Sequence, residues 1–286
     1  MKIREINNQI YCGYKGKKSL LDLIYPVKAS PLPPVIFAHG FKGFKDWGHF
    51  PLLCKKIAAS GFCVLKFNFS HNGGSLHQAI DFPDLSAFSE NSYWRELADV
   101  EGVLQFLKDD LVKMPDAPDL NLDQISMIGH SRGGGIAFLA AEKYLEIKKV
   151  VSWAGVSDFK SRLPEAELLE QWKKEGVRII ENSRTKQNMP MKYSFVEELY
   201  AHEDELNIEA AVKKMAADLL LIHGTQDETL NPLMAKQIAG WKKDAALVLI
   251  ENAGHTFGGK HPWHENDLPE ASEKLLQASI QFLKQA

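Results

Sequence analysis

The chain has 286 residues, of which 45% are hydrophobic and 25% are charged, a composition typical of a globular protein with a large core. Its formal net charge of −3 excludes a general electrostatic attraction to nucleic acid or to anionic membranes. No stretch approaches the roughly 18 apolar residues of a spanning helix, so we expect no membrane insertion.

Three cysteines, Cys12, Cys54 and Cys63, have neither a C-x-x-C spacing nor the spacing of metal ligands. An odd number of cysteines without a disulfide framework is typical of free thiols in a reducing compartment. The N-terminal segment MKIREINNQIYCGYKG lacks the apolar stretch of a signal peptide. We therefore expect a cytoplasmic protein.

The first half of the chain predicts a hairpin followed by a strand, a helix and a second strand. The first thirty residues are typical of an antiparallel hairpin at a sheet edge. Short apolar runs at Pro34–Gly40 and Gly61–Phe69 predict strands, and the spacing of apolar residues between them predicts a helix. The polar stretch His71–Asn91 predicts a long loop, and such loops often carry function.

An amphipathic helix with apolar residues from Leu97 to Leu111 comes next, ended by Pro115 and Pro118. Beyond it, strands and helices alternate. Strands are predicted in QISMIG, KVVSWAG, DLLLIHG and AALVLIE, and helices in GGIAFLAAEKYL, NPLMAKQIAGW and PEASEKLLQASIQFLKQ. Strands that are apolar on both faces predict a mostly parallel central sheet with helices on both faces.

Residues 160–215 interrupt this alternation, because they are highly charged and contain no clear strand pattern. We predict a helical cap there, inserted into a core formed by residues 1–159 and 216–286. The cap's apolar residues are expected to pack on the core or to form an apolar wall of the site. They are Leu168, Leu169, Trp172, Val177, Ile179, Ile180, Tyr193, Phe195, Leu199 and Tyr200.

The segment MIGHSRGGGIAFLA places Ser131 between Gly129 and Gly133, at the junction of a predicted strand and a predicted helix. A G-x-S-x-G sequence in this position is typical of a nucleophile elbow, in which a sharp turn lifts the serine hydroxyl above the sheet. Glycines avoid collisions around such a turn. The alternative is an ordinary strand-to-helix turn with a serine that caps the helix.

A nucleophilic serine needs a base and an acid, which in such folds follow it in the order serine, acid, histidine. Asp227 and His255 follow two successive predicted strands in that order. All three residues are therefore expected at the carboxyl edge of one parallel sheet, where ligands bind. Asp158, which follows the strand KVVSWAG, is a second candidate for the acid.

An oxyanion hole needs two backbone donors. The N–H of Arg132, directly after the serine, and the N–H of Phe41, in the sequence FAHGFKG, are our candidates. We also name three substrate-contacting candidates, His39, His261 and Trp172. For the His39 side chain, a buried structural role is the favoured alternative.

A metal site is not expected in HTFGGKHPWH, although it holds His255, His261 and His264. Gly258, Gly259 and Pro262 prevent a regular helix there, and no cysteine or acid repeats at ligand spacing. The sequence GHSRGGG also lacks the Gly-Lys-Ser/Thr ending of a phosphate-binding loop. We therefore predict neither a metal nor a cofactor.

Taken together, AHGFKG, GHSRGG, HGTQDETLNP and AGHTF resemble motifs of the α/β-hydrolase superfamily. The resemblance is strongest to its dienelactone-hydrolase, cinnamoyl-esterase and prolyl-oligopeptidase-related members, and covers nearly the whole chain. It implies an α/β-hydrolase fold with Ser131 as nucleophile, His255 as base and Asp227 as the residue that orients it. The segment LKFNFSHNGGS departs from the similar family segment, because Asn68 replaces the usual aspartate and His71–Asn72 replaces a Gly-His pair.

The expected function is hydrolysis of a small-molecule ester with a small or moderate acyl group, through an acyl-enzyme on Ser131. One alternative is a serine peptidase of the prolyl-oligopeptidase type. Another is a non-catalytic binding protein on the same fold, since a fold does not fix a function. The sequence does not specify the acyl group, the alcohol or the oligomeric state.

Overall fold

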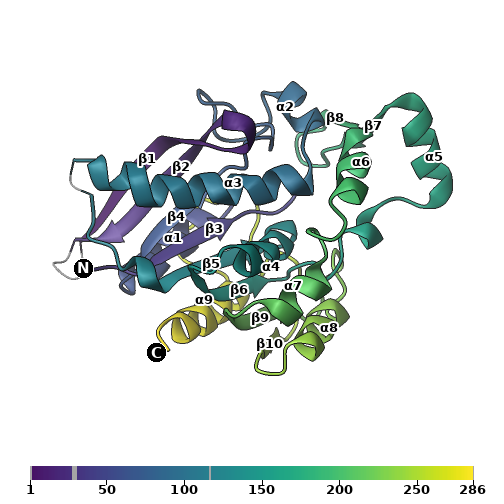
Figure 1. Ribbon diagram of the computed structural model, residues 1–286. Coiled ribbons are helices and arrows are strands. Elements are labelled where there is room, and N and C mark those ends of the chain that lie inside the picture. Colours follow the sequence, from purple (N-terminus) through teal and green to yellow (C-terminus); the bar gives the residue numbers. More distant parts are fainter. Residues whose placement is uncertain (1, 28–30, 116, 286) are drawn as a thin grey trace.

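A computed structural model describes residues 2–27, 31–115 and 117–285, built around an eight-stranded sheet in the order β1-β2-β4-β3-β5-β6-β9-β10 (Figure 1). The strands of this sheet are β1 (Ile3–Cys12), β2 (Lys18–Pro26), β3 (Pro34–Ala38), β4 (Cys63–Phe67), β5 (Ile125–His130), β6 (Ile147–Trp153), β9 (Asp218–Gly224) and β10 (Ala246–Ile250).

The sheet is antiparallel only at one edge, where β1 pairs with β2 and β2 pairs with β4. All pairs from β4 through β3, β5, β6 and β9 to β10 are parallel. The prediction of an N-terminal hairpin on a mostly parallel sheet is thus confirmed. Because parallel strands point the same way, the segments after β3, β5, β9 and β10 all emerge at one edge.

Helices cover both faces of the sheet, as the alternating pattern predicts. The helices that cover the sheet are α1 (Phe50–Ala59), α3 (Tyr93–Gln105), α4 (Arg132–Lys143), α7 (Ile208–Lys214), α8 (Leu233–Trp241) and α9 (Glu270–Leu283). Of these, α7 belongs to the insertion of residues 160–215. In Figure 1, α3, α4, α7 and α8 lie on the near face, and α1 and α9 lie behind the sheet. Each face therefore has its own buried apolar cluster.

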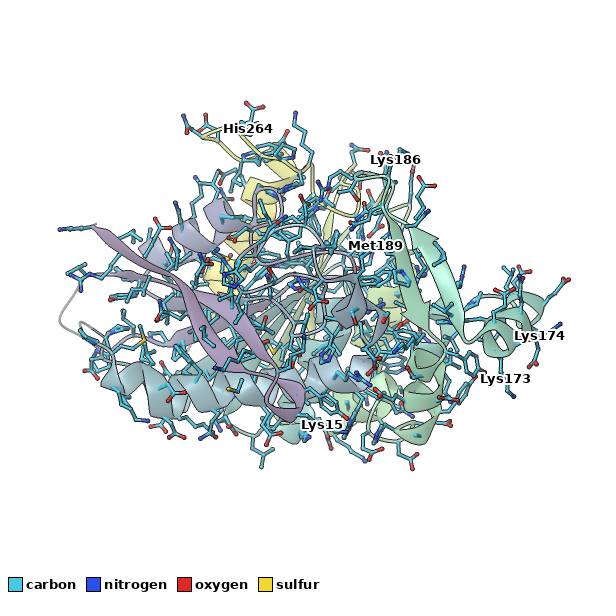
Figure 2. The ribbon with its side chains drawn as sticks, turned by 90° about the horizontal axis from the view of Figure 1, so that it is seen from above. Lys15, Lys173, Lys174, Lys186, Met189 and His264 are labelled. Carbon is cyan, nitrogen blue, oxygen red and sulfur yellow. The ribbon has the colours of Figure 1, made fainter. Side chains whose placement is uncertain are left out.

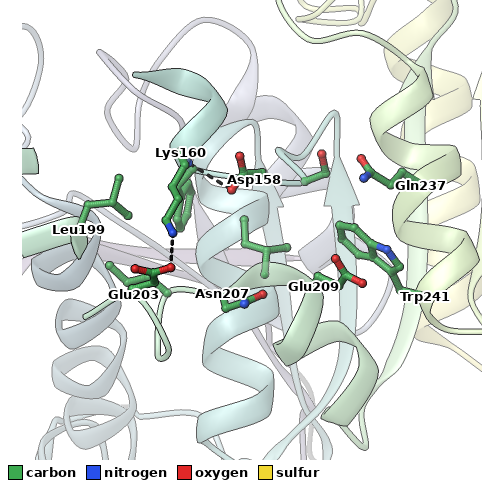
Figure 3. Close-up of a pocket in the computed structure, with 12 residues that line it drawn as sticks. Asp158, Lys160, Leu199, Glu203, Asn207, Glu209, Gln237 and Trp241 are labelled. Atoms are coloured by element: carbon green, nitrogen blue, oxygen red, sulfur yellow. Dashed lines mark hydrogen bonds and ion pairs between the residues drawn. The ribbon is translucent and has the colours of Figure 1, made fainter. Parts of the chain in front are cut away.

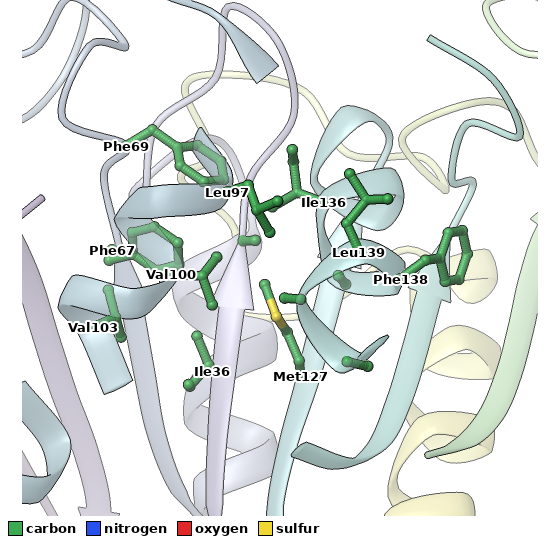
Figure 4. Close-up of a cluster of buried hydrophobic side chains, with 14 of the residues drawn as sticks. Ile36, Phe67, Phe69, Leu97, Val100, Val103, Met127, Ile136, Phe138 and Leu139 are labelled. Carbon is green, nitrogen blue, oxygen red and sulfur yellow. The ribbon is translucent and has the colours of Figure 1, made fainter. Parts of the chain in front are cut away.

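The near-face cluster joins the middle strands to two helices (Figure 4). Ile36 of β3 and Met127 of β5 lie opposite Val100 of α3 and Ile136 of α4, all of them fully buried. Burial of side chains of this size contributes about 1.5–3 kcal/mol each. This packing fixes α4, and with it the residue that precedes α4, against the sheet.

Two local features depart from the sequence expectations. The helix predicted through Leu111 is regular only to Gln105, and continues as a π turn, Phe106–Asp110, and a 3-10 turn, Leu111–Lys113. The stretch His71–Asn91, expected to be a loop, contains the short helix α2 (Leu85–Ser89). The carboxylate of Asp84 caps α2 by accepting a hydrogen bond from the Ala87 N–H at 2.9 Å.

The prediction of an entirely helical insertion between β6 and β9 is wrong. After a 3-10 turn (Lys160–Arg162) and α5 (Ala166–Glu175), the chain forms a separate hairpin of β7 (Val177–Glu181) and β8 (Asn188–Lys192), followed by α6 (Ser194–Ala201). Gly176, with φ of 74°, ends α5 in the left-handed conformation that glycine favours. The five residues of β7 then alternate between exposed and half-buried positions, a strand pattern hidden by the surrounding charges.

Trp172 lies in the interior of the insertion, where its indole N–H donates to the Met191 carbonyl at 2.9 Å. Its ring stacks near Phe195, which in turn packs on Tyr93 of α3. The expectation that some of the named residues pack on the core is confirmed for Trp172, Phe195 and Leu199. The expected apolar wall is not formed, because none of the ten residues lines a pocket beside Ser131, and four of them are exposed. The exposed ones are Leu168, Val177, Ile179 and Tyr200.

Ion pairs hold the insertion to the long loop and to α3. Arg95 of α3 pairs with Glu198 of α6 at 2.6 Å, and Lys192 of β8 pairs with Glu90. The turn of the hairpin, residues 182–187, reaches the segment before α2, where the Gln187 side chain donates to the Phe82 carbonyl at 3.0 Å. Figure 2 shows Lys186 and Met189 on this hairpin, with Lys173 and Lys174 at the outer end of the insertion.

No helix in the described parts of the chain is both long and apolar enough to span a membrane.

A buried charge network joins the N-terminal hairpin to the loop after β3. The Asp22 carboxylate of β2 lies between the ammonium groups of Lys45 and Lys66, and both lysines also pair with Asp46. Asp22 and Lys45 are each about 2% exposed. Burial opposes the ionisation of Lys66 and Asp46, but the opposite charges beside them outweigh it, so the pKa of Lys66 is raised and that of Asp46 is lowered.

We predict that Asp22→Asn destabilises the protein by about 3–5 kcal/mol, since two buried ammonium groups would then share one carboxylate. Urea unfolding of the variant measures this loss. Asp110→Asn is the matched control, because its pair with Lys113 is largely exposed and is expected to be worth less than about 1 kcal/mol. Equal effects of the two substitutions would contradict a stabilising role for the buried network.

Candidate active site

Ser131 lies at the junction of β5 and α4 with φ of 57° and ψ of −119°. Such a backbone conformation costs a residue other than glycine on the order of 1–3 kcal/mol. Backbone hydrogen bonds hold it: the Ser131 N–H donates to the Trp153 carbonyl at 2.9 Å, and the Ser131 carbonyl accepts from the N–H groups of Gly134 and Val156 at 3.0 and 3.3 Å. The sharp strand-to-helix turn expected at this motif is therefore present.

The motif's glycines are required by close backbone approach. A Cβ at Gly129 would lie 2.2 Å from the Gly133 carbonyl oxygen, and one at Gly133 would lie 2.5 Å from the Ala38 carbonyl oxygen. Any side chain at either position would force the strand and the helix apart. The turn thus brings α4 directly against the ends of β3 and β5.

His255 and Asp227, from the loops after β10 and β9, are hydrogen-bonded to each other. The His255 Nδ1 lies 2.8 Å from the Asp227 Oδ2, so Nδ1 carries the proton and the ring's Nε2 is left as an acceptor. The other carboxylate oxygen accepts the N–H groups of Thr229 and Leu230 at 2.8 and 2.9 Å. The structure thus brings the predicted acid and base together.

His223, at the end of β9, is a further partner of the acid that the sequence analysis missed. Its Nε2 lies 3.1 Å from the Asp227 Oδ2 and 3.0 Å from the Leu230 carbonyl oxygen, both acceptors, so Nε2 is protonated. Burial disfavours a charged carboxylate, but hydrogen bonds from His223 and His255 outweigh this. They hold the pKa of Asp227 well below its usual range. In the sequence HGTQD this histidine lies four residues before the acid, and this short spacing could have indicated the contact between the two side chains.

His130, directly before the serine, supports the base from the other side. Its Nε2 donates to the His255 backbone carbonyl at 3.0 Å, and the two rings lie 4.9 Å apart. Burial, together with the neighbouring His255, lowers the pKa of His130 to about 3. The ring is therefore neutral at physiological pH and adds no positive charge beside the base.

Asp158, the second candidate for the acid, lies in a different environment (Figure 3). Its exposed carboxylate accepts the N–H groups of Lys160 and Ser161, at 3.1 and 2.6 Å. It lines a separate pocket with Glu203 and Trp241, to which neither Ser131 nor His255 contributes. The geometry therefore favours Asp227 as the partner of His255.

The two candidate oxyanion donors lie on either side of Ser131. Phe41 belongs to a tight turn closed by a hydrogen bond from the Gly43 N–H to the Gly40 carbonyl at 3.0 Å. Arg132 is the first residue of α4, where backbone N–H groups lack helical partners. In the described part of the chain, no acceptor takes the N–H of Phe41 or of Arg132, so both remain able to bind an anion.

The Arg132 side chain links four segments around this site. Its guanidinium donates to Asn91 at 2.8 Å and pairs with the buried Glu96 of α3 at 3.2 Å. It also lies over the rings of Phe41 and Phe195, at 4.0 and 5.5 Å from their centroids. One side chain therefore connects the candidate oxyanion turn, α3 and the insertion.

Two pockets flank Ser131, and Phe41, Lys42, Ser131 and His255 line both of them. The hairpin pocket, of about 240 Å³, is completed by the β7–β8 turn and by aromatic residues. Its other lining residues are Gly40, Gly43, Trp47, Phe50, His130, Asn182, Ser183, Arg184 and Thr256. The aromatic pocket, of about 320 Å³, is completed by Tyr93, Arg132, Val156, Phe159, Arg162, Thr229 and Leu230.

The three candidates for substrate contact are placed behind the pockets. Trp172 is buried in the insertion and lines neither of them, which corrects that expectation. His261 accepts a hydrogen bond from the Gly48 N–H at 2.8 Å and packs near Trp47, one layer behind the hairpin pocket.

His39 is 2% exposed, and both nitrogens of its ring are hydrogen-bonded to the backbone. Its Nδ1 contacts the Gly40 carbonyl oxygen at 2.8 Å, and its Nε2 accepts from the Phe69 N–H at 3.3 Å. The favoured alternative of a buried structural role therefore fits its surroundings, whereas contact with substrate does not. The ring joins the turn after β3 to the segment after β4.

No group of three or more metal-ligating side chains occurs in the residues that the structure describes. His264 lies exposed in the loop after β10, as Figure 2 shows.

The profile of the alpha/beta hydrolase family matches residues 35–267, which is most of the chain. The protein belongs to this family. The match includes Ser131, Asp227 and His255, and the strand order and mostly parallel sheet agree with it.

Solved structures of similar fold cover nearly the whole chain. Est1E from Butyrivibrio proteoclasticus with bound ferulic acid matches with a TM-score of 0.67 and 19% identity, over 96% of this chain and 98% of that one. A putative hydrolase from Agrobacterium vitis matches with a TM-score of 0.70 and 16% identity over all of both chains. A putative dienelactone hydrolase from Klebsiella pneumoniae matches with a TM-score of 0.64 and 16% identity, also over all of both chains. At these identities the likeness shows a shared fold.

We predict that His39 makes stability depend on pH. Burial lowers its pKa to about 4, against about 6.5 in an unfolded chain, so between these values only the unfolded chain binds the proton. Stability is thus fully present above pH 6.5 and is lost as the pH falls through this window, by about 2 kcal/mol at pH 5. Urea unfolding at pH 7 and pH 5 should show a gap that is smaller in His39→Gln by about this amount. An unchanged gap would contradict a buried, neutral His39.

Proposed function

We propose that the protein is a serine carboxylesterase that forms an acyl-enzyme on Ser131. The observation that carries the proposal is the arrangement at one sheet edge. Ser131 and His255 line the same two pockets, and His255 is bonded through Nδ1 to a buried carboxylate. Because Nδ1 donates its proton to Asp227 in a hydrogen bond, the lone pair of Nε2 is free to act as the base.

In the first half of the reaction, His255 accepts the Ser131 proton while the serine oxygen attacks the ester carbonyl carbon. The N–H groups of Phe41 and Arg132 stabilise the negative charge that develops on the carbonyl oxygen. His255 then gives the proton to the departing alcohol, and water releases the acid by the reverse sequence. Asp227 stays ionised and orients the ring, with His223 and His130 as positioning residues. The chemistry requires no metal or cofactor.

The substrate is proposed to be a small-molecule ester with a small to moderate acyl group, aromatic or sugar-linked ones included. Pockets of about 240 and 320 Å³ on the two sides of Ser131 have room for one such group each. The bound ferulic acid in the structurally similar Est1E supports aromatic acyl groups as a starting point.

We further propose that residues 160–215 act as a cap on a core of residues 1–159 and 216–286. Arg162 and the turn at Asn182–Arg184 support this, because they place part of the insertion in the lining of the two pockets.

The three cysteines are free thiols, which supports the proposal of a cytoplasmic location.

Ser131→Ala is expected to lower kcat/KM for a 4-nitrophenyl ester by a factor on the order of 10⁴, because the nucleophile is lost. Turnover assays measure this loss, and circular dichroism checks that the fold is retained. A fluorophosphonate should label the wild type but not the variant. Labelling without ester turnover, but with cleavage of aminoacyl amides, would favour a peptidase. Absence of labelling would favour a binding protein.

Asp227→Asn is expected to lower kcat by several orders of magnitude, because the amide no longer fixes the productive imidazole tautomer. Asp158→Asn is the matched control: its carboxylate caps a turn at the separate pocket, so kcat should stay within about twofold. Both variants are compared on one substrate. A larger loss in Asp158→Asn would transfer the role of the acid to that residue.

A further inference from the structure

The aromatic pocket carries a positive charge that the proposed ester chemistry does not use. Lys42, Arg132 and Arg162 line it, and its described lining contains no aspartate or glutamate. Arg132 is neutralised by its buried pair with Glu96. Lys42 and Arg162 remain as candidates for contact with a ligand.

Lys42 is partly buried and has a weak partner. Its ammonium donates to the Glu181 backbone carbonyl at 3.3 Å and lies 5.9 Å from the centre of the Phe41 ring. The Glu181 carboxylate pairs instead with Lys186, at 3.3 Å. Within the described residues Lys42 forms no ion pair, so an incoming anion would meet a cation with unused hydrogen-bonding capacity.

Arg162 lies at the exposed side of the same pocket. It also forms no ion pair with any residue in the described ranges 2–27, 31–115 and 117–285. Asp158, four residues before it, is engaged by the N–H groups of Lys160 and Ser161 and lines the neighbouring pocket of Figure 3. A free guanidinium offers paired donors that match a carboxylate.

Much of the remaining wall of the aromatic pocket is aromatic or aliphatic. The rings of Tyr93 and Phe159 stack with centroids 3.8 Å apart, and Val156 and Leu230 are buried beside them. An anionic group that enters this pocket loses water, and the attraction to nearby cations increases as water is excluded. A neutral ligand would gain only the apolar contact.

We propose that the preferred substrates are esters that carry a carboxylate on the part that occupies the aromatic pocket, where Lys42 and Arg162 bind it. This inference rests on the proposed esterase function and specifies its substrate class. The carboxylate is a permanent part of the substrate and takes no part in bond making or breaking. Binding it should lower KM and raise kcat/KM without changing the roles of Ser131 and His255.

Two matched ester pairs test the inference from both sides of the scissile bond. Mono-4-nitrophenyl glutarate is compared with its methyl ester, so that the charge lies on the acyl part. 4-Carboxyphenyl butyrate is compared with 4-(methoxycarbonyl)phenyl butyrate, so that the charge lies on the alcohol part. The uncatalysed rate of each ester is subtracted before kcat/KM is calculated, because the carboxylate of a monoaryl glutarate attacks its own ester in water. The wild type should prefer the anionic member of at least one pair by about five- to tenfold at low ionic strength, and less at 1 M salt.

The variants Arg162→Gln and Lys42→Gln should each reduce this preference, and the double variant should abolish it. Arg162→Lys should retain part of it, because the charge remains while the paired donors are lost. Lys173→Gln is the matched control: it removes one positive charge from the exposed outer end of the insertion, and should leave the preference unchanged.

The outcomes separate this inference from the function on which it rests. Hydrolysis of the neutral esters with no anionic preference in either pair overturns the inference and leaves the esterase proposal standing. A preference that persists in the double variant overturns the assignment to Lys42 and Arg162. Failure to hydrolyse any ester, together with failure of Ser131 to react with a fluorophosphonate, overturns both proposals.

Discussion

The arrangement of the site depends on the backbone of Ser131. Its φ of 57° is held because the chain before it is fixed in the parallel pairing of β5 with β3 and β6, and the chain after it is fixed by α4. Gly129 and Gly133 permit that approach, since a Cβ at either would overlap backbone atoms. The packing energy of the sheet and α4 thus offsets the strain at one residue. Without the sheet, the loops that bear Asp227 and His255 would have no common edge.

Arg132 extends this constraint to the outer parts of the molecule. Its backbone begins α4, while its side chain reaches Glu96, Asn91 and the rings of Phe41 and Phe195. The position of the turn at Phe41 is therefore coupled to the packing of the insertion. The network of Asp22, Lys45, Lys66 and Asp46 acts on the same turn from the opposite side. Asn68, which replaces an aspartate of the family motif, accepts the Lys45 N–H and so joins that network to the strand end.

Local sequence signals predicted the sheet, its helices and the meeting of Asp227 with His255, because hydrophobic periodicity and chain order decide these features. They failed at β7 and β8, where a strand pattern of five residues is masked by charged neighbours and its partner strand contains a proline, which is disfavoured in strands. They also failed for Trp172 and His261, whose surroundings are set by tertiary packing. Lys42 and Arg162 lie more than a hundred residues apart, so no local pattern relates them to one pocket. The roles of the site residues stay predictions until they are tested.

The β7–β8 hairpin forms its own two-stranded sheet, and among the described residues its strands pair with no strand of the main sheet. Its turn nevertheless supplies Asn182, Ser183 and Arg184 to the hairpin pocket. A change in the length or composition of this turn leaves the register of the main sheet and the strained serine untouched. In evolutionary terms, the hairpin is a unit in which selectivity can diverge rapidly while the chemistry is retained. For engineering, it is the segment into which loops from other hydrolases can be grafted.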